Sequence, residues 1–131
     1  ETLAERISHL YLPLAKNKKV NLEFAIDKSK EHIHFSRNKI LQIIGSPVSS
    51  AIKLSEPGAL IKIQLSLLVQ SDRNILYVEI NSNAPIREEI RPNSAVLNFT
   101  KELIESKDGS FDFECNELNG LSYKLSIPQT A

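Results

Sequence analysis

Two spacings of apolar residues alternate along the chain and divide it into segments. In three stretches apolar positions recur every three or four residues, as in a helix with one buried face. In most of the other stretches apolar and polar residues alternate, as in a strand with one buried face, while the mostly apolar run 75–80 predicts the return strand of a hairpin. The helical stretches are 2–18, 36–54 and 94–106, and the alternating stretches are 20–26, 32–35, 61–67, 75–80, 111–115 and 121–127.

This order of segments, α-β-β-α-β-β-α-β-β, predicts an α+β fold. Each helix is followed by a pair of strands, which favours a two-layer α/β sandwich with three helices on one mixed, mostly antiparallel sheet. Pro13 and Pro47 fall inside helical stretches, where the missing N–H is expected to bend the helix. Asn119-Gly120 predicts a tight hairpin. Residues 81–92 form the longest predicted loop and are therefore the natural place for a site.

Composition narrows the classes of protein to which this chain can belong. The 131 residues fit one domain, 1–131, and the net charge is zero, with 16 basic and 16 acidic residues. We therefore expect no nucleic-acid partner and no direct contact with an anionic membrane. No apolar run reaches the length of a membrane span, which is typical of a soluble globule. Because the chain begins with Glu1 rather than Met, we expect it to be a fragment of a longer protein.

Candidate metal and nucleophile chemistry is sparse. The single cysteine, Cys115, excludes an internal disulfide and a multi-cysteine metal site, and its alternation with two phenylalanines predicts a small core residue. His32 and His34 share one face of a predicted strand and could pair on a metal, but they have no third ligand nearby. We therefore predict no metal site, and no Ser-His-Asp order or nucleophile elbow is present.

Glycine is scarce, which bears on any site that binds phosphate. The chain has four glycines, where average usage would give roughly nine. Three of them, Gly58, Gly109 and Gly120, fall at predicted turns, and Gly45 falls inside the second helix. None is left for a glycine-rich phosphate loop.

Four segments resemble one known family. Residues 36–58, SRNKILQIIGSPVSSAIKLSEPG, resemble the N-box helix of the ATP-binding domain of sensor histidine kinases, within the gyrase, Hsp90, histidine kinase and MutL group of ATPases. YVEINSNAPI stands where that family carries its first glycine box, and SAVLNFTKELIESKDGSFDFEC resembles its second glycine box, helix and strand. GLSYKLSIP resembles its closing strand. The resemblance covers nearly the whole chain and implies the two-layer, Bergerat-type ATPase fold.

The resemblance also implies where catalytic and metal-binding side chains would lie. In active members two asparagines of the N-box serve the chemistry, and the second holds Mg²⁺ through its amide oxygen. The corresponding positions are Ser46 and Ser50. A serine hydroxyl is shorter than a carboxamide and a poorer Mg²⁺ ligand, and Pro47 lies between the two. The resemblance therefore implies a degenerate metal position.

The nucleotide-binding positions are altered in the same way. The aspartate that accepts a hydrogen bond from adenine corresponds to Asn81, which can still accept through its amide oxygen. The glycines of the two boxes correspond to Asn83, Pro85, Ser94 and Val96. Glycines serve there because the backbone must approach the nucleotide closely, which neither proline nor valine permits. These positions are vestiges of a phosphate cradle.

The length and charge of the segment between the two boxes also disfavour binding of a triphosphate. Between the two boxes only seven residues remain where active kinases carry a longer lid, and Glu88 and Glu89 would repel a triphosphate. Lys53 and Lys39 remain as possible phosphate contacts, although lysines on a polar helix face are usually only solvated.

These observations favour one functional hypothesis and leave two alternatives. The favoured hypothesis is a pseudokinase-like, degenerate ATPase domain of a two-component signalling protein, without a cofactor and acting through protein contacts. Its partners would be the helical dimerisation domain of the same homodimeric protein and a response regulator or another kinase, on the cytoplasmic side of a membrane-bound sensor. One alternative is a divergent active kinase that binds ATP and Mg²⁺ and phosphorylates a histidine in the missing domain. The other is a pocket for a different small molecule.

Overall fold

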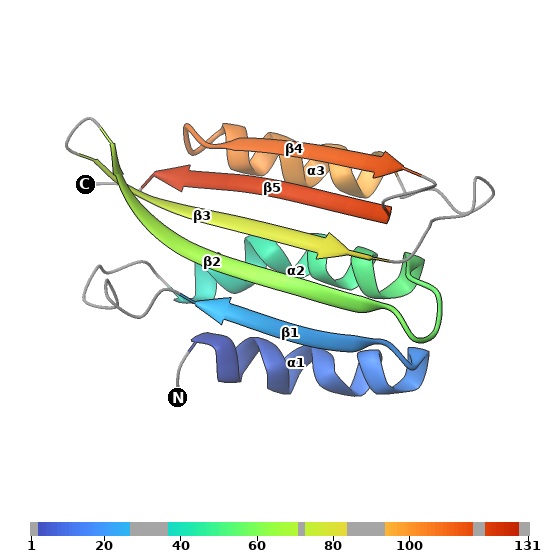
Figure 1. Cartoon of the computed structure of the whole chain (residues 1–131). Helices are drawn as coiled ribbons and strands as arrows, with labels where there is room; N and C mark the ends of the chain where they lie inside the picture. The colour runs from blue at the N-terminus through green and yellow to red at the C-terminus, as the bar shows by residue number, and fades with distance from the viewer. Residues whose placement is uncertain (1–2, 27–36, 71–72, 84–93, 117–119, 129–131) are drawn as a thin grey trace.

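A computed structural model gives the arrangement of the chain and describes residues 3–26, 37–70, 73–83, 94–116 and 120–128. Three helices and five strands follow one another in the order α1, β1, α2, β2, β3, α3, β4, β5 (Figure 1). Their bounds are α1 Leu3–Lys18, β1 Asn21–Ile26, α2 Arg37–Leu54, β2 Leu60–Gln70, β3 Arg73–Ser82, α3 Ser94–Glu105, β4 Ser110–Asn116 and β5 Gly120–Pro128. The predicted strand at 32–35 lies outside the described residues.

The five strands form one mixed sheet with the order β1-β2-β3-β5-β4. Only β1 and β2 run parallel, and the remaining neighbours are antiparallel. The parallel pair is joined through α2, as a crossover connection requires, whereas β2–β3 and β4–β5 are hairpins. The α+β sandwich with a mostly antiparallel mixed sheet is therefore confirmed.

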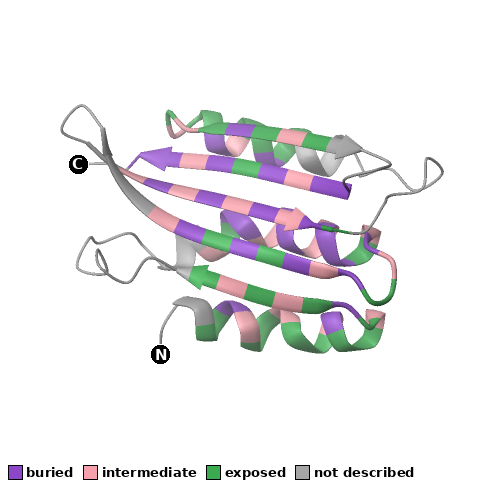
Figure 2. Cartoon of the chain, viewed as in Figure 1, coloured by how far each residue is buried: buried purple, intermediate pink, exposed green. Residues whose placement is uncertain are grey.

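All three helices cover the same face of the sheet (Figure 1). The burial of the strands alternates accordingly, and Figure 2 shows the alternation most clearly along β2 and β5. On β3, Val78 and Ile80 are fully buried beneath the helices, whereas Tyr77 and Glu79 on the other face are half-buried. Any side chain of β3 that contacts α2 must therefore lie on the same face of the strand as Val78 and Ile80.

Helix α2 lies over the middle of the sheet, and α1 packs beside it (Figure 1). It runs without interruption from Arg37 to Leu54, with Pro47 inside it and buried. Gly45 sits where α1 comes closest, because a methyl group added there would lie 2.7 Å from the hydroxyl oxygen of Tyr11. Burial also raises the pKa of Tyr11 above its ordinary value of 10.0.

The turn predictions for two glycines are confirmed by their backbone angles. Gly58 has φ 91° and Gly120 has φ 83°, in the left-handed region where glycine is strongly favoured. Gly120 is the first residue of β5, and Gly58 lies in the turn that ends two residues before β2. None of the helices in the described ranges is long and apolar enough to cross a membrane.

Candidate functional site

Ser50 lies on α2 and faces the sheet through a hydrogen bond to β5. Its Oγ atom is 2.8 Å from the phenol oxygen of Tyr123, and either hydroxyl can be the donor. Tyr123 is fully buried and pairs across the sheet with Ile80, which places it on the face that the helices cover. The position at which the resemblance implies a metal ligand is therefore occupied by a contact within the chain.

Two aromatic neighbours fix the ring of Tyr123. Phe113 on β4 stacks on it with ring centroids 5.2 Å apart, and Phe111 lies 6.0 Å away at a tilt of 32°. Both distances fall in the range of favourable aromatic pairs. Because the ring is held from the β4 side, its hydroxyl stays directed at α2. Sequence reasoning did not single out Tyr123, although the alternation of β5 indicated that it would be buried.

A second pair of hydroxyls joins the end of α2 to the end of β3. Ser55 Oγ donates to the carbonyl oxygen of Ala51 at 2.6 Å and is 2.6 Å from Ser82 Oγ. Ser55 and Ser82 are both buried. Ser82 is a second residue that the sequence reasoning missed. The alternation along β3 could have found it, because residues 76, 78, 80 and 82 share the buried face of the strand.

Asn81 points away from this group. It lies on the face of β3 opposite Ile80 and Ser82, opposes Ser122 on β5, and donates through Nδ2 to Glu79 Oε1 at 3.2 Å. Its predicted role as an adenine contact requires it to face α2 together with Ser50. The structure does not bring these two side chains together, because consecutive residues of a strand alternate between faces.

Asn83 closes the end of the β2–β3 hairpin rather than lining a pocket. Its Oδ1 accepts a hydrogen bond from the backbone N–H of Leu60 at 2.8 Å, and its own N–H donates to the Leu60 carbonyl at 3.2 Å. The side-chain oxygen and the backbone N–H of Asn83 are thus both hydrogen-bonded to Leu60 of β2. This use of an asparagine at a strand end is structural.

Two polar residues of α2 remain without such a partner. Ser46 lies one turn before Ser50, and its Oγ is buried with no hydrogen-bond partner within the described residues. Lys53 is exposed on the same helix. Ser46 and Ser50 share a helix face, whereas Lys53 is turned out to solvent, so the predicted phosphate contact is separated from the hydroxyl pair.

The remaining predicted positions are described only in part. Helix α3 begins at Ser94, and Val96 lies in its first turn, so both positions are at a helix N-terminus. Pro85, Glu88, Glu89, His32 and His34 lie outside the described residues, as do the side chains of Lys39 and Cys115. Among the residues described, no group of three His, Cys, Asp or Glu side chains could hold a metal ion.

The donor set on α2 does not fit Mg²⁺. This ion demands octahedral oxygen coordination and is held in proteins through carboxylates, phosphates and water. The α2 segment around Ser50, SPVSS, offers three neutral serine hydroxyls, and that of Ser50 is already bound to Tyr123 at 2.8 Å. This segment of α2 carries no carboxylate.

Comparison with known proteins identifies the fold. No family model matches the chain, and no curated protein matches it in sequence. Among solved structures, histidine kinase ThkA in complex with the response regulator protein TrrA superposes with a TM-score of 0.74 at 21% identity, covering 98% of this chain and 40% of that one. A structure of the ThkA catalytic domain alone gives a TM-score of 0.70 at 21% identity, covering 98% of this chain and 92% of that domain.

A third comparison agrees with these two. The Acinetobacter baumannii histidine kinase AdeS gives a TM-score of 0.67 at 19% identity, covering 98% of this chain and 64% of that one. The chain thus spans 40% of the ThkA chain crystallised with its regulator and nearly all of the isolated catalytic domain. The element order, the mixed sheet and these superpositions together show that the chain has the fold of the histidine kinase catalytic, ATP-binding domain.

Proposed function

We propose that this chain is a degenerate ATPase domain of the histidine-kinase type that does not bind ATP productively and acts as a regulatory, protein-interaction module. The observation that carries the proposal is the hydrogen bond between Ser50 and Tyr123. It joins the vestigial metal position to a fully buried phenol in the middle of the sheet. A ligand that used Ser50 would have to compete with a contact that the fold already makes.

The energetic argument follows from burial. If Ser50 turned to a ligand, its hydrogen bond to Tyr123 would be lost, and a hydrogen bond inside a protein contributes roughly 0.5–1.5 kcal/mol to stability. That cost would be subtracted from each ligand's binding energy. Ser55 and Ser82 bind each other in the same way, so a second pair of hydroxyls near the helix end is also engaged internally. These hydroxyls therefore stabilise the fold and are less available to bind a ligand.

The proposed partners are proteins of a two-component system. The domain would contact the helical dimerisation domain of its own homodimeric parent on the cytoplasmic side, and a response regulator or a second kinase. ThkA, which shares this fold, has been crystallised with the response regulator protein TrrA, which supports a partner of that class. In this proposal residues 1–131 form one domain, and its role is to transmit conformational state rather than to transfer phosphate.

Calorimetric titration tests the proposal directly. The purified 131-residue chain is titrated with ATP and with ADP, each in the presence and absence of Mg²⁺, and we expect no heat of binding in any of the four titrations. Circular dichroism of the same sample confirms that the domain is folded. Micromolar binding that depends on Mg²⁺ would overturn the proposal and would favour the divergent active kinase.

A further inference from the structure

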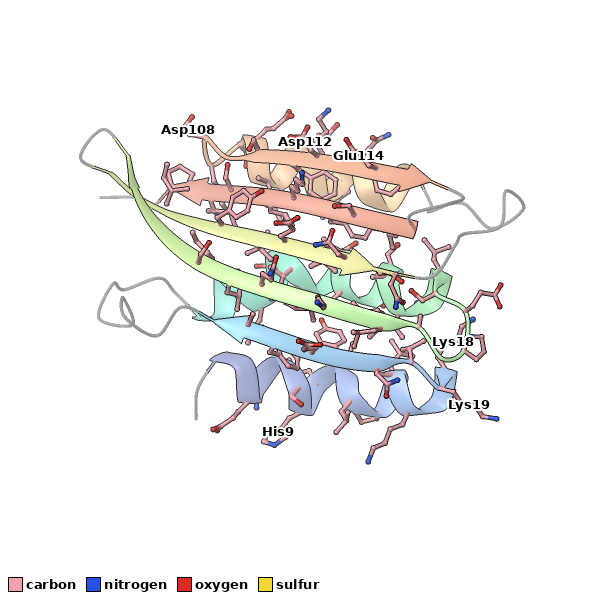
Figure 3. The ribbon with its side chains drawn as sticks, viewed as in Figure 1. His9, Lys18, Lys19, Asp108, Asp112 and Glu114 are labelled. Carbon is pink, nitrogen blue, oxygen red and sulfur yellow. The ribbon has the colours of Figure 1, made fainter. Side chains whose placement is uncertain are left out.

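We draw no further inference here: the strongest candidate, the outer edge of the border strand β4, where Asp112 and Glu114 lie exposed on the open face of the sheet (Figure 3), carries no proposal, because acidic side chains on an edge strand are sufficient to keep it from pairing with a like strand, and nothing in the described part of the structure shows what covers it.

Discussion

Removing either hydroxyl of the Ser50–Tyr123 pair tests whether this contact is a real constraint on the site. The two oxygens are 2.8 Å apart, and their burial differs, because Tyr123 is fully buried and Ser50 is half-buried. Tyr123→Phe leaves Ser50 unpaired where water can still reach it, and we expect a loss of about 1 kcal/mol. Ser50→Ala removes the same hydrogen bond from the side of α2, and we expect a loss of about 1 kcal/mol as well.

The double variant S50A/Y123F distinguishes a hydrogen bond from two unrelated packing effects. If the two hydroxyls act through their mutual hydrogen bond, either single change already removes it, so the double variant should lose less than the sum of the two single losses. The coupling energy between the two positions is expected to be about 1 kcal/mol or more, beyond the additivity error of about 0.5 kcal/mol.

Urea unfolding followed by circular dichroism supplies the four free energies. With a slope of about 2 kcal/mol per molar, a change of 1 kcal/mol moves the midpoint by about 0.5 M. Tyr77→Phe is a control, since its phenol is on the open face of the sheet and is only half-buried. Additive losses from Ser50 and Tyr123 would refute the reasoning from the hydrogen bond.

Four further predictions concern the frame around the site. Gly45→Ala is expected to lose about 1–2 kcal/mol in urea unfolding, because its methyl group would meet the Tyr11 hydroxyl at 2.7 Å, and in a Tyr11→Phe background the same change should cost less or be stabilising. Burial raises the pKa of Tyr11 above 10.0, so the unfolded chain loses this proton first and stability should fall as pH rises above about 10; thermal unfolding of Y11F should show a smaller fall. Ser55→Ala leaves Ser82 buried without its 2.6 Å partner and should cost about 1–3 kcal/mol by the same urea assay. Gly58→Ala should cost about 1 kcal/mol in thermal unfolding, because alanine is strained at φ 91° although the space around it is open.

The fold could be predicted from sequence because its signals are local and repeat. Strict alternation on 61–65 and 121–127 fixed which residues of β2 and β5 are buried, and Gly58 and Gly120 marked where strands begin. The order of strands in the sheet could not be predicted in this way, because it depends on pairing between distant segments. The alternation along β5 does not indicate that this strand inserts between β3 and β4.

The candidate site was predicted less well, for a reason that lies in strand geometry. Matching the C-terminal part of β3 to a family motif placed Asn81 at the ligand position. A strand presents alternate residues to opposite faces, however, and Ser82, not Asn81, is bonded to Ser55 at the end of α2. The buried parity of Val78 and Ile80 was visible in the sequence and was sufficient to expose the conflict. Tyr123 was missed because its partner is 73 residues away, a pairing that no local pattern reports.

Replacing Ser50 by asparagine is expected to disturb the contact between α2 and β5. An asparagine side chain has two more heavy atoms than serine, and the present oxygen already lies 2.8 Å from the phenol of Tyr123. The longer side chain therefore requires Tyr123 to move, and Tyr123 is held by Phe113 at a centroid distance of 5.2 Å. A working site would need coordinated changes on α2, β5 and β4. The packing of α2 against β5 and β4 therefore opposes a longer side chain at position 50.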